Sequence, residues 1–201
     1  MSREKILASI SANQPQPVSL PEIPFFTIEE IEPAEKFTNV AVTIGAKVFK
    51  ASNLDEIKAT LKQEEKIVGR IVSTLQEFND IAESVDFENT DPHILEDVEL
   101  AIIRAEFAVA ENSASWISAR SAAERVLPFI CQHLVILVQK DAIIPTMHKA
   151  YERIGGLEYE YATFIAGPSK TADIEQSLVL GAHGPRSLTV FILDELVRGG
   201  L

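Results

Sequence analysis

The sequence contains a single cysteine, Cys131, among its 201 residues. One thiol cannot close a disulfide within the chain, and it cannot supply the four thiolates of an ordinary iron–sulfur cluster. Long apolar runs are also missing: no stretch approaches the ~20 residues that cross a bilayer, and the first residues lack the continuous apolar segment of a secretory signal. We therefore expect a cytoplasmic protein with no metal and no cofactor of its own.

Positive charge is scarce as well. The chain carries 18 Lys and Arg against 30 Asp and Glu, a formal net charge of -12 at pH 7. No basic patch interrupts this excess, so nucleic acid and anionic membranes are unsuitable partners. The sequence also lacks a glycine-rich dinucleotide motif, a P-loop, a nucleophile elbow and an HExxH zinc motif, which excludes the enzyme classes that those motifs define.

What is present suffices for one substantial core, since 46% of the residues are hydrophobic. Residues 1–30 are expected to form a short helix, capped by Ser2 and ending near Ser11, and then a proline-rich arm. The arm is expected because four prolines lie between Asn13 and Pro24, and proline removes a backbone donor and restricts the residue before it. Residues 31–201 are expected to form a single domain.

Helical and strand patterns alternate within this domain. Helices are predicted for residues 33–45, from Ser52 as N-cap through Leu61, and from Pro145 in the first turn to Gly155. Strands are predicted for residues 46–50, 66–73, 100–110, 129–138, 160–166 and 187–193. This order indicates an α/β fold, with a mainly parallel sheet sandwiched by helices.

Two polar clusters follow predicted strands. Residues 111–115, Glu-Asn-Ser-Ala-Ser, come after the strand that ends near Ala110, and residues 167–171, Gly-Pro-Ser-Lys-Thr, come after the strand that ends near Ala166. Ligands of open α/β sheets bind beyond the carboxyl ends of the strands, where loops and helix N-termini converge. We therefore expect both clusters at that edge of the sheet.

The second cluster continues to Asp173 and Glu175. Ser169 or Thr171 is predicted to begin a short helix with Asp173 in its first turn, so that Thr171 and Glu175 share one face. A capped helix end explains these residues without any ligand. Lys170, at a strand-to-helix turn, suits an anion.

Glycines and charged side chains recur just before the last predicted strand, in Gly181-Ala182-His183-Gly184-Pro185-Arg186. Glycine lets a backbone approach a ligand closely, His183 can exchange a proton near neutral pH, and Arg186 can hold a carboxylate or phosphate with two hydrogen bonds. A tight turn with a solvated arginine explains the same residues equally well.

Residues 167–175 and 181–185 resemble the C-terminal signature of the LUD-domain family, named for lactate utilisation, and within it the lactate utilisation protein C group. The signature reads G-P-S-[KR]-T-A-D-I-E followed by G-x-H-G-P, and every named position matches. A second block of the family, A-E-T-G-T, is similar at Ala110 and Glu111. There Asn112-Ser113-Ala114 stands in place of Thr-Gly-Thr, so a glycine-dependent turn would need rebuilding.

The resemblance implies the α/β superfold of sugar-phosphate isomerases and coenzyme A transferases. It also implies a cytoplasmic part in oxidising L-lactate to pyruvate, beside partner proteins that carry iron–sulfur clusters. We therefore expect an accessory or ligand-binding subunit, with a homo-oligomer also compatible. The alternatives are an independent enzyme acting on a sugar phosphate or an acyl-coenzyme A, and a purely structural interaction module.

One cleft is expected to gather the candidate site residues around a small anionic ligand. His183 would carry a proton, with Glu111 or Asp173 as the orienting group or base. Lys170 and Arg186 would hold the carboxylate or phosphate of the ligand. The further ligand-binding candidates are Gly167, Ser169, Thr171, Glu175 and Gly184.

Overall fold

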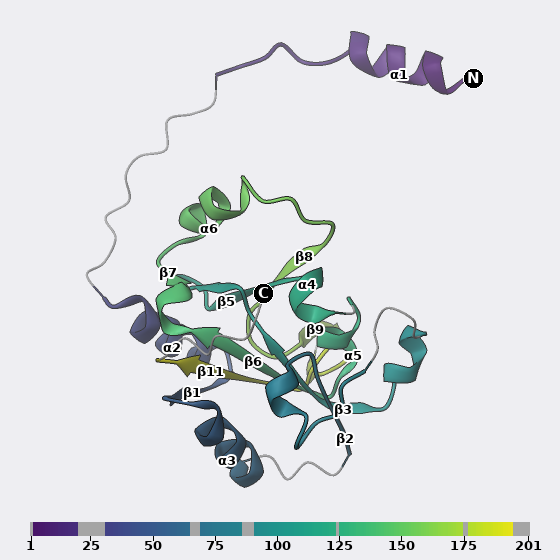
Figure 1. The fold of residues 1–201 in the computed structure, drawn as a ribbon. Helices are drawn as coiled ribbons and strands as arrows, with labels where there is room; N and C mark the ends of the chain where they lie inside the picture. Colours follow the sequence, from purple (N-terminus) through teal and green to yellow (C-terminus); the bar gives the residue numbers. More distant parts are fainter. Residues whose placement is uncertain are drawn as a thin grey trace.

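A five-stranded parallel sheet, here called the main sheet, forms the centre of the domain (Figure 1). The structure is a computed structural model that describes residues 2–19, 31–64, 69–85, 91–123, 125–174 and 177–194. The strand order is β1-β11-β6-β3-β2, and every neighbouring pair is parallel. The strands are β1 (Lys47–Ala51), β2 (Arg70–Ser73), β3 (Val98–Arg104), β6 (His133–Gln139) and β11 (Ser187–Leu193). The predicted α/β fold with a mainly parallel sheet is thereby confirmed.

A second, four-stranded sheet covers one face of the main sheet. This small sheet has the order β7-β4-β5-β8, with β4 (Phe107–Val109), β5 (Ala114–Ser118), β7 (Ile143–Ile144) and β8 (Ala162–Ile165). Ala101 and Ile103 of β3 share a buried cluster with Ala108 of β4 and Ile117 of β5, and Phe37 of α2 (Pro33–Thr43) joins the same cluster. On this face the expected layer of helices is therefore largely a layer of strands.

Helices cover the two outer faces. Ile57 and Leu61 of α3 (Leu54–Glu64) pack with Leu100 and Ile102 on the free face of the main sheet. The outer face of the small sheet packs against α6 (Met147–Ile154), with Phe107, Trp116, Ala150 and Ile154 in one cluster. Successive strand residues enter different clusters, as the two-residue period of a strand requires. The layers thus run α3, main sheet, small sheet, α6, which Figure 1 shows from bottom to top.

The chain passes from the main sheet to the small sheet between Ala105 and Glu106. The Ala105 amide donates to the carbonyl of Leu137 in β6 (2.8 Å), whereas the Glu106 amide donates to the carbonyl of Trp116 in β5 (3.1 Å). The prediction of one strand over residues 100–110 is therefore wrong. Apolar residues continue through the break because both β3 and β4 are buried.

The predicted helices are present, but their N-terminal caps differ from the expectation. For α3 the cap is Asn53 and not Ser52, because the Asn53 Oδ1 accepts from the Glu56 amide (3.0 Å). For α6 the cap is Thr146, and Pro145 precedes the helix. The predicted glycine stop after α2 is confirmed, since Gly45 adopts a φ of 98°. Asparagine and threonine are as able to cap as the residues that were predicted.

The remaining helical segments of the described chain are short. Residues 129 and 130, predicted as the start of a strand, belong to α5 (Leu127–Ile130), and β6 begins only at His133. The other segments are η1 (Gln76–Phe78), η2 (Pro92–Leu95), α4 (Ala119–Ala122) and η3 (Lys140–Ala142).

The predicted N-terminal helix is α1 (Arg3–Ala12), and none of its residues is buried. Ser2 makes no side-chain capping bond, contrary to the prediction. Ile6, Leu7 and Ile10 are exposed, and Figure 1 shows α1 apart from the sheets. Among the described residues, no helix has the length and apolar character needed to cross a membrane.

The only cysteine is inaccessible in the folded protein. Cys131 is 1% exposed, and burial raises the pKa of its thiol to about 12. Because the thiolate is the reactive form, we expect iodoacetamide at about pH 8 to leave Cys131 unmodified in the native protein and to alkylate it in denaturant. Intact mass spectrometry measures the mass added. Rapid alkylation under native conditions would contradict the buried placement.

Candidate functional site

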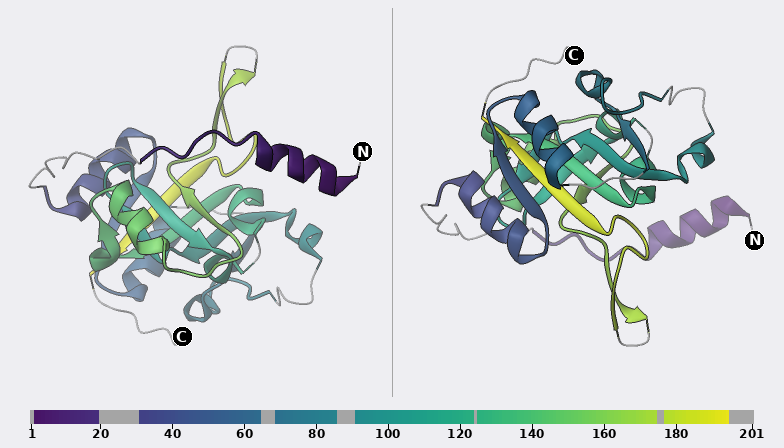
Figure 2. Two further views of the ribbon diagram at one scale, coloured as in Figure 1. Left: turned by 90° about the horizontal axis from the view of Figure 1, so that it is seen from above. Right: turned by 90° about the horizontal axis from the view of Figure 1, so that it is seen from below.

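Residues that were predicted to form a short helix instead form a β-hairpin. β9 (Lys170–Ile174) pairs antiparallel with β10 (Ser177–Leu180), with Thr171 opposite Val179, and Figure 2 shows this hairpin projecting from the body of the domain. The predicted helix start at Ser169 or Thr171 is therefore wrong. Asp173 lies in β9, and Glu175 lies outside the described residues.

The two halves of the signature meet at the base of the hairpin. The first signature loop is residues 167–170 and the second is residues 181–186. The Ser169 amide donates to the carbonyl of Pro185 (2.9 Å), and the Gly181 amide donates to the carbonyl of Ser169 (3.1 Å). A Cβ atom placed on Gly184 would lie 3.2 Å from the Ser169 Cβ. Ser169 thus joins the two signature loops through its backbone, and His183 lies exposed in the second of them.

The ammonium group of Lys170 lies at the C-terminal end of α2. Its Nζ donates to the carbonyl of Ile44, the C-cap of that helix (2.6 Å). Gly167, at a φ of 70°, packs beside the same residue, since a Cβ there would lie 3.1 Å from the Ile44 Cδ1. A cation at a helix C-terminus is favoured by the helix dipole. An ammonium has three donors, so this bond leaves two of them for a ligand.

The signature loops lie at the amino ends of the main-sheet strands, and not at the carboxyl ends as predicted. The Arg186 amide donates to the carbonyl of Gln132 (2.8 Å), and β11 and β6 begin at the residues that follow these two. The Gly167 loop does follow a strand, β8, but that strand belongs to the small sheet. Sequence order alone could not show which sheet β8 joins.

Arg186 faces carboxylates. With Glu96, Asp97 and Glu99 it lines a hollow of about 290 Å³, the acidic hollow. Arg70 lies 2.8 Å from Asp97, and the Nε2 of His133 lies 3.6 Å from Glu99. Arg186 thus shares this hollow with three carboxylates, two of which already have a basic side chain beside them. The role of Arg186 in holding the ligand stays a prediction.

Glu111 lies at the N-terminal end of α6. Its Oε2 accepts from the Met147 amide (2.8 Å), and its own amide donates to the carbonyl of Pro145 (3.1 Å). A carboxylate is favoured at a helix N-terminus by the helix dipole, so Glu111 has a structural role whether or not it acts on a ligand. The contacts described for Glu111 go to α6, and those of the signature loops go to α2 and the start of β11. The single cleft that would join them stays a prediction.

Ser113 stands where the family pattern has glycine. Its φ is 55°, in the left-handed region, it is 2% exposed, and its Oγ has no hydrogen-bond partner among the described residues. The side chain of Asn112 supports the turn by accepting from the Ala114 amide (3.1 Å). Ser113 thus holds a left-handed conformation that glycine adopts at less cost.

We expect Ser113→Gly to stabilise the protein by about 1 kcal/mol, because it removes a side chain from a left-handed residue and a buried hydroxyl without a partner. Urea unfolding followed by circular dichroism measures the difference in free energy. Ser115→Gly is the matched control, because Ser115 is also buried without a partner but lies in β5, where glycine weakens a strand. Equal effects of the two substitutions would show that the hydroxyl, and not the backbone, matters.

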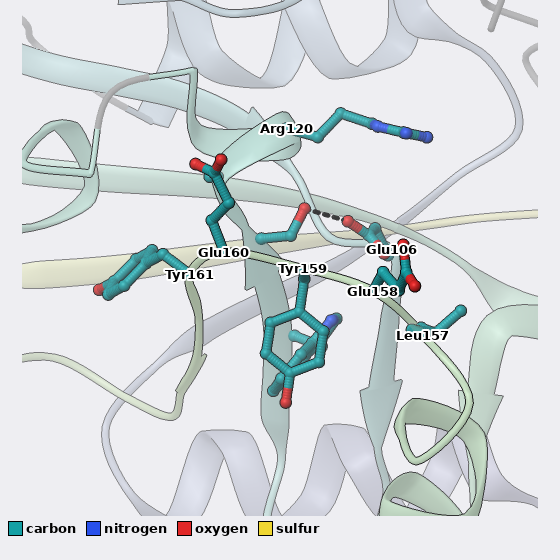
Figure 3. A pocket seen from close by; sticks show the side chains of 10 residues that line it. Glu106, Arg120, Leu157, Glu158, Tyr159, Glu160 and Tyr161 are labelled. Atoms are coloured by element: carbon teal, nitrogen blue, oxygen red, sulfur yellow. Dashed lines mark hydrogen bonds between the residues drawn. The ribbon is translucent and has the colours of Figure 1, made fainter.

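A pocket of about 430 Å³ opens beyond the carboxyl end of β3 (Figure 3). This carboxyl-end pocket is lined by Glu106, by Trp116 and residues 118–120 at the end of β5, and by residues 157–161 ahead of β8. None of these residues was among the sequence candidates. In the sequence, Glu106 is a charged residue inside the apolar run of residues 100–110. A charge just after the end of a buried strand is the signal that would have identified it. The described residues include no group of three His, Cys, Asp or Glu placed to hold a metal ion.

A family model described as LUD domain matches residues 83–193. Two similar relatives are named lactate utilization protein C. The protein from Bacillus pumilus is 29% identical over 108 residues, which are 51% of this chain and 45% of that protein. The protein from Geobacillus kaustophilus is 30% identical over 106 residues, which are 50% of this chain and 44% of that protein. The chain thus spans about half the length of the relatives it matches.

A solved structure supports the fold. A DUF162 family protein from Deinococcus radiodurans superposes with a TM-score of 0.61 at 18% sequence identity, covering 81% of this chain and 96% of that one. At this identity the likeness concerns the fold alone.

Proposed function

This chain belongs to the LUD domain family, and on that premise we propose that it works in lactate utilisation. Its part is that of an accessory or ligand-binding subunit in the oxidation of L-lactate to pyruvate. Partner proteins would carry the iron–sulfur clusters, since the single cysteine of this chain cannot hold one. The names of the similar proteins from Bacillus pumilus and Geobacillus kaustophilus support the lactate role.

The observation that carries the proposal is the joint of the two signature loops at Ser169. Backbone bonds to Pro185 and from Gly181 hold the loops together, so Lys170 and His183 belong to one compact loop pair. A glycine-rich backbone close to a cation is a suitable place for a small carboxylate, which takes hydrogen bonds from backbone amides and from the ammonium.

The roles within this site follow from the chemistry of each group. Lys170 would hold the carboxylate with the donors that the Ile44 carbonyl leaves. His183 would take or give the proton if the chain takes part in the reaction, with Asp173 or Glu111 as orienting group or base. Gly167, Ser169, Thr171 and Gly184 would line the ligand. Arg186 would add a second donor for the carboxylate, for which the carboxylates of the acidic hollow would compete.

Thermal unfolding of the purified protein with L-lactate, pyruvate, acetate and inorganic phosphate tests the ligand class. A ligand at a hundred times its dissociation constant stabilises the folded state by about 2.7 kcal/mol. We expect L-lactate or pyruvate to raise the melting temperature, and Lys170→Met to remove the shift. Lys149→Met is the matched control, because Lys149 is exposed in α6 and pairs only with Glu152 in the described contacts (2.7 Å). No shift with either compound would contradict the ligand-binding role.

Thermal unfolding with a sugar phosphate and with an acyl-coenzyme A tests the alternative of an independent enzyme. A shift with a sugar phosphate or an acyl-coenzyme A and none with lactate or pyruvate would favour that alternative. The subunit role is tested by mixing the protein with iron–sulfur lactate-utilisation proteins. A subunit should restore lactate oxidation only in the mixture, whereas a separate enzyme should turn over by itself.

A further inference from the structure

We propose that the carboxyl-end pocket is a second binding site, and that its ligand is a small organic cation carrying an amine or guanidinium group. This inference goes beyond the proposed lactate role and concerns the other end of the main sheet. The pocket volume, about 430 Å³, falls within the range of roughly 300–1,000 Å³ that is usual for small-molecule sites.

The position of the pocket favours a binding site. Glu106 follows Ala105, the residue after the inner strand β3, and ligands of open α/β sheets bind beyond the carboxyl ends of the strands. Three separate stretches of chain contribute side chains: the β3–β4 crossing, the end of β5, and the segment ahead of β8. Figure 3 shows these side chains around one opening.

The carboxylate of Glu106 is held in position by hydroxyl groups. Its Oε1 accepts from the Ser118 Oγ and, at 3.3 Å, from the Ser121 Oγ, and the Ser118 bond is drawn in Figure 3. The Glu106 backbone is fixed as well, by the bond of its amide to Trp116 (3.1 Å). A carboxylate oriented in this way is ready for a hydrogen-bond donor before any ligand arrives.

The charge of the pocket selects a cation. Glu106, Glu158 and Glu160 line it with a single basic residue, Arg120. Arg125 lies 3.7 Å from Glu160 at the surface and offsets that carboxylate. With Arg120 counted against Glu106 and Glu158, one negative charge remains in the pocket, which favours a cation over lactate, pyruvate or phosphate.

The exposed ring of Tyr159 supplies the aromatic surface of the site, and the buried Trp116 lies behind it. Trp116 and Tyr159 line the pocket, and their rings meet edge to face at 5.4 Å. Tyr161, in the same lining, already receives a cation, because the guanidinium carbon of Arg125 lies 5.3 Å from its ring centre. Carboxylates beside aromatic faces are the usual surroundings of bound organic cations.

Trp116 also provides the measurement, because it is the only tryptophan in the chain. We expect its fluorescence to change saturably on titration with agmatine, putrescine or choline, with half-saturation at roughly 1 mM or below. The three probes distinguish a guanidinium, a primary amine and a quaternary ammonium. Acetate and L-lactate serve as anion controls and should leave the emission unchanged. If no cation gives a saturable change, or if the anions give the same change, the proposal is wrong.

Two variants connect the signal to the pocket. Glu158→Gln and Glu106→Gln should each raise the apparent dissociation constant at least about tenfold, which corresponds to roughly 1.4 kcal/mol. Glu96→Gln, in the acidic hollow at the other end of the sheet, should titrate like the parent protein. Should Glu106→Gln prevent folding, the exposed Glu158 decides the test alone. If folded Glu158→Gln binds the cations as tightly as the parent protein, the proposal is wrong. That result would say nothing about the Lys170 site, which is tested separately by the change in melting temperature with lactate or pyruvate.

Discussion

Replacing Phe107 with alanine should destabilise the protein by about 3–5 kcal/mol. Phe107 is 1% exposed and connects the small sheet to α6. Its ring stacks on Trp116 at 5.8 Å, meets the edge of Phe164 at 6.1 Å, and lies 4.8 Å from the guanidinium carbon of Arg153. Alanine would leave a cavity among these rings, and a loss of this size is a large part of the 5–15 kcal/mol that typically stabilises a domain.

Urea unfolding followed by far-ultraviolet circular dichroism measures the change for Phe107→Ala. Trp116 fluorescence, recorded on the same samples, reports whether the wall of the carboxyl-end pocket loosens first. Phe129→Ala is the control, because Phe129 is 38% exposed and its truncation should cost no more than about 1 kcal/mol. A Phe107→Ala protein as stable as the control would contradict the packing of the small sheet described above.

Gly181→Ala should disrupt the joint of the signature loops and cost about 2–4 kcal/mol. Gly181 adopts a φ of 79°, and a Cβ there would lie 2.4 Å from the Arg186 Cγ. An alanine must therefore either strain the backbone or push Arg186 away, and both changes weaken the Gly181–Ser169 bond. Under the proposed function, the melting shift with lactate or pyruvate should disappear together with this bond.

Gly156→Ala is the matched control for Gly181→Ala. A Cβ on Gly156 would meet no atom within 4 Å, so its replacement should leave both stability and ligand response within about 0.5 kcal/mol of the parent. Thermal unfolding with and without ligand compares the two variants directly. A Gly181→Ala protein that melts like Gly156→Ala and still responds to the ligand would show that the loops need not meet.

Elements with a strong local pattern could be predicted from the sequence. The last strand, β11, was placed at its observed bounds, because a run of buried residues follows a turn that contains a proline; six of its seven residues are buried. The helices α2, α3 and α6 were found from the spacing of their apolar residues. The cap of α3 was predicted one residue too early, because both Ser52 and Asn53 are able to accept the capping bond, and α6 begins at Met147, after Pro145.

The sequence could not show which strands pair with one another, and this caused the two larger errors. Residues 170–174 carry helix-start signals, but β10 gives them a partner strand, and tertiary pairing outweighs such weak local preferences. The run of residues 100–110 is apolar throughout, so nothing in it marks the crossing at Ala105 to a second sheet. Because the sequence did not reveal the small sheet, it could not show at which end of the main sheet the signature loops lie. For the same reason it could not show that the residues of the carboxyl-end pocket lie close together.

The joint at Ser169 is built from backbone groups, and this has a consequence for saturation mutagenesis. Backbone amides and carbonyls are the same in almost every amino acid, so replacements at Ser169 and His183 should leave protein abundance and solubility unchanged, whereas replacements at Gly181 should lower both. A library of such variants can be scored for cellular protein level and for growth on lactate. Positions at which replacements abolish growth but leave the protein level unchanged would therefore identify side chains needed for the chemistry and not for folding.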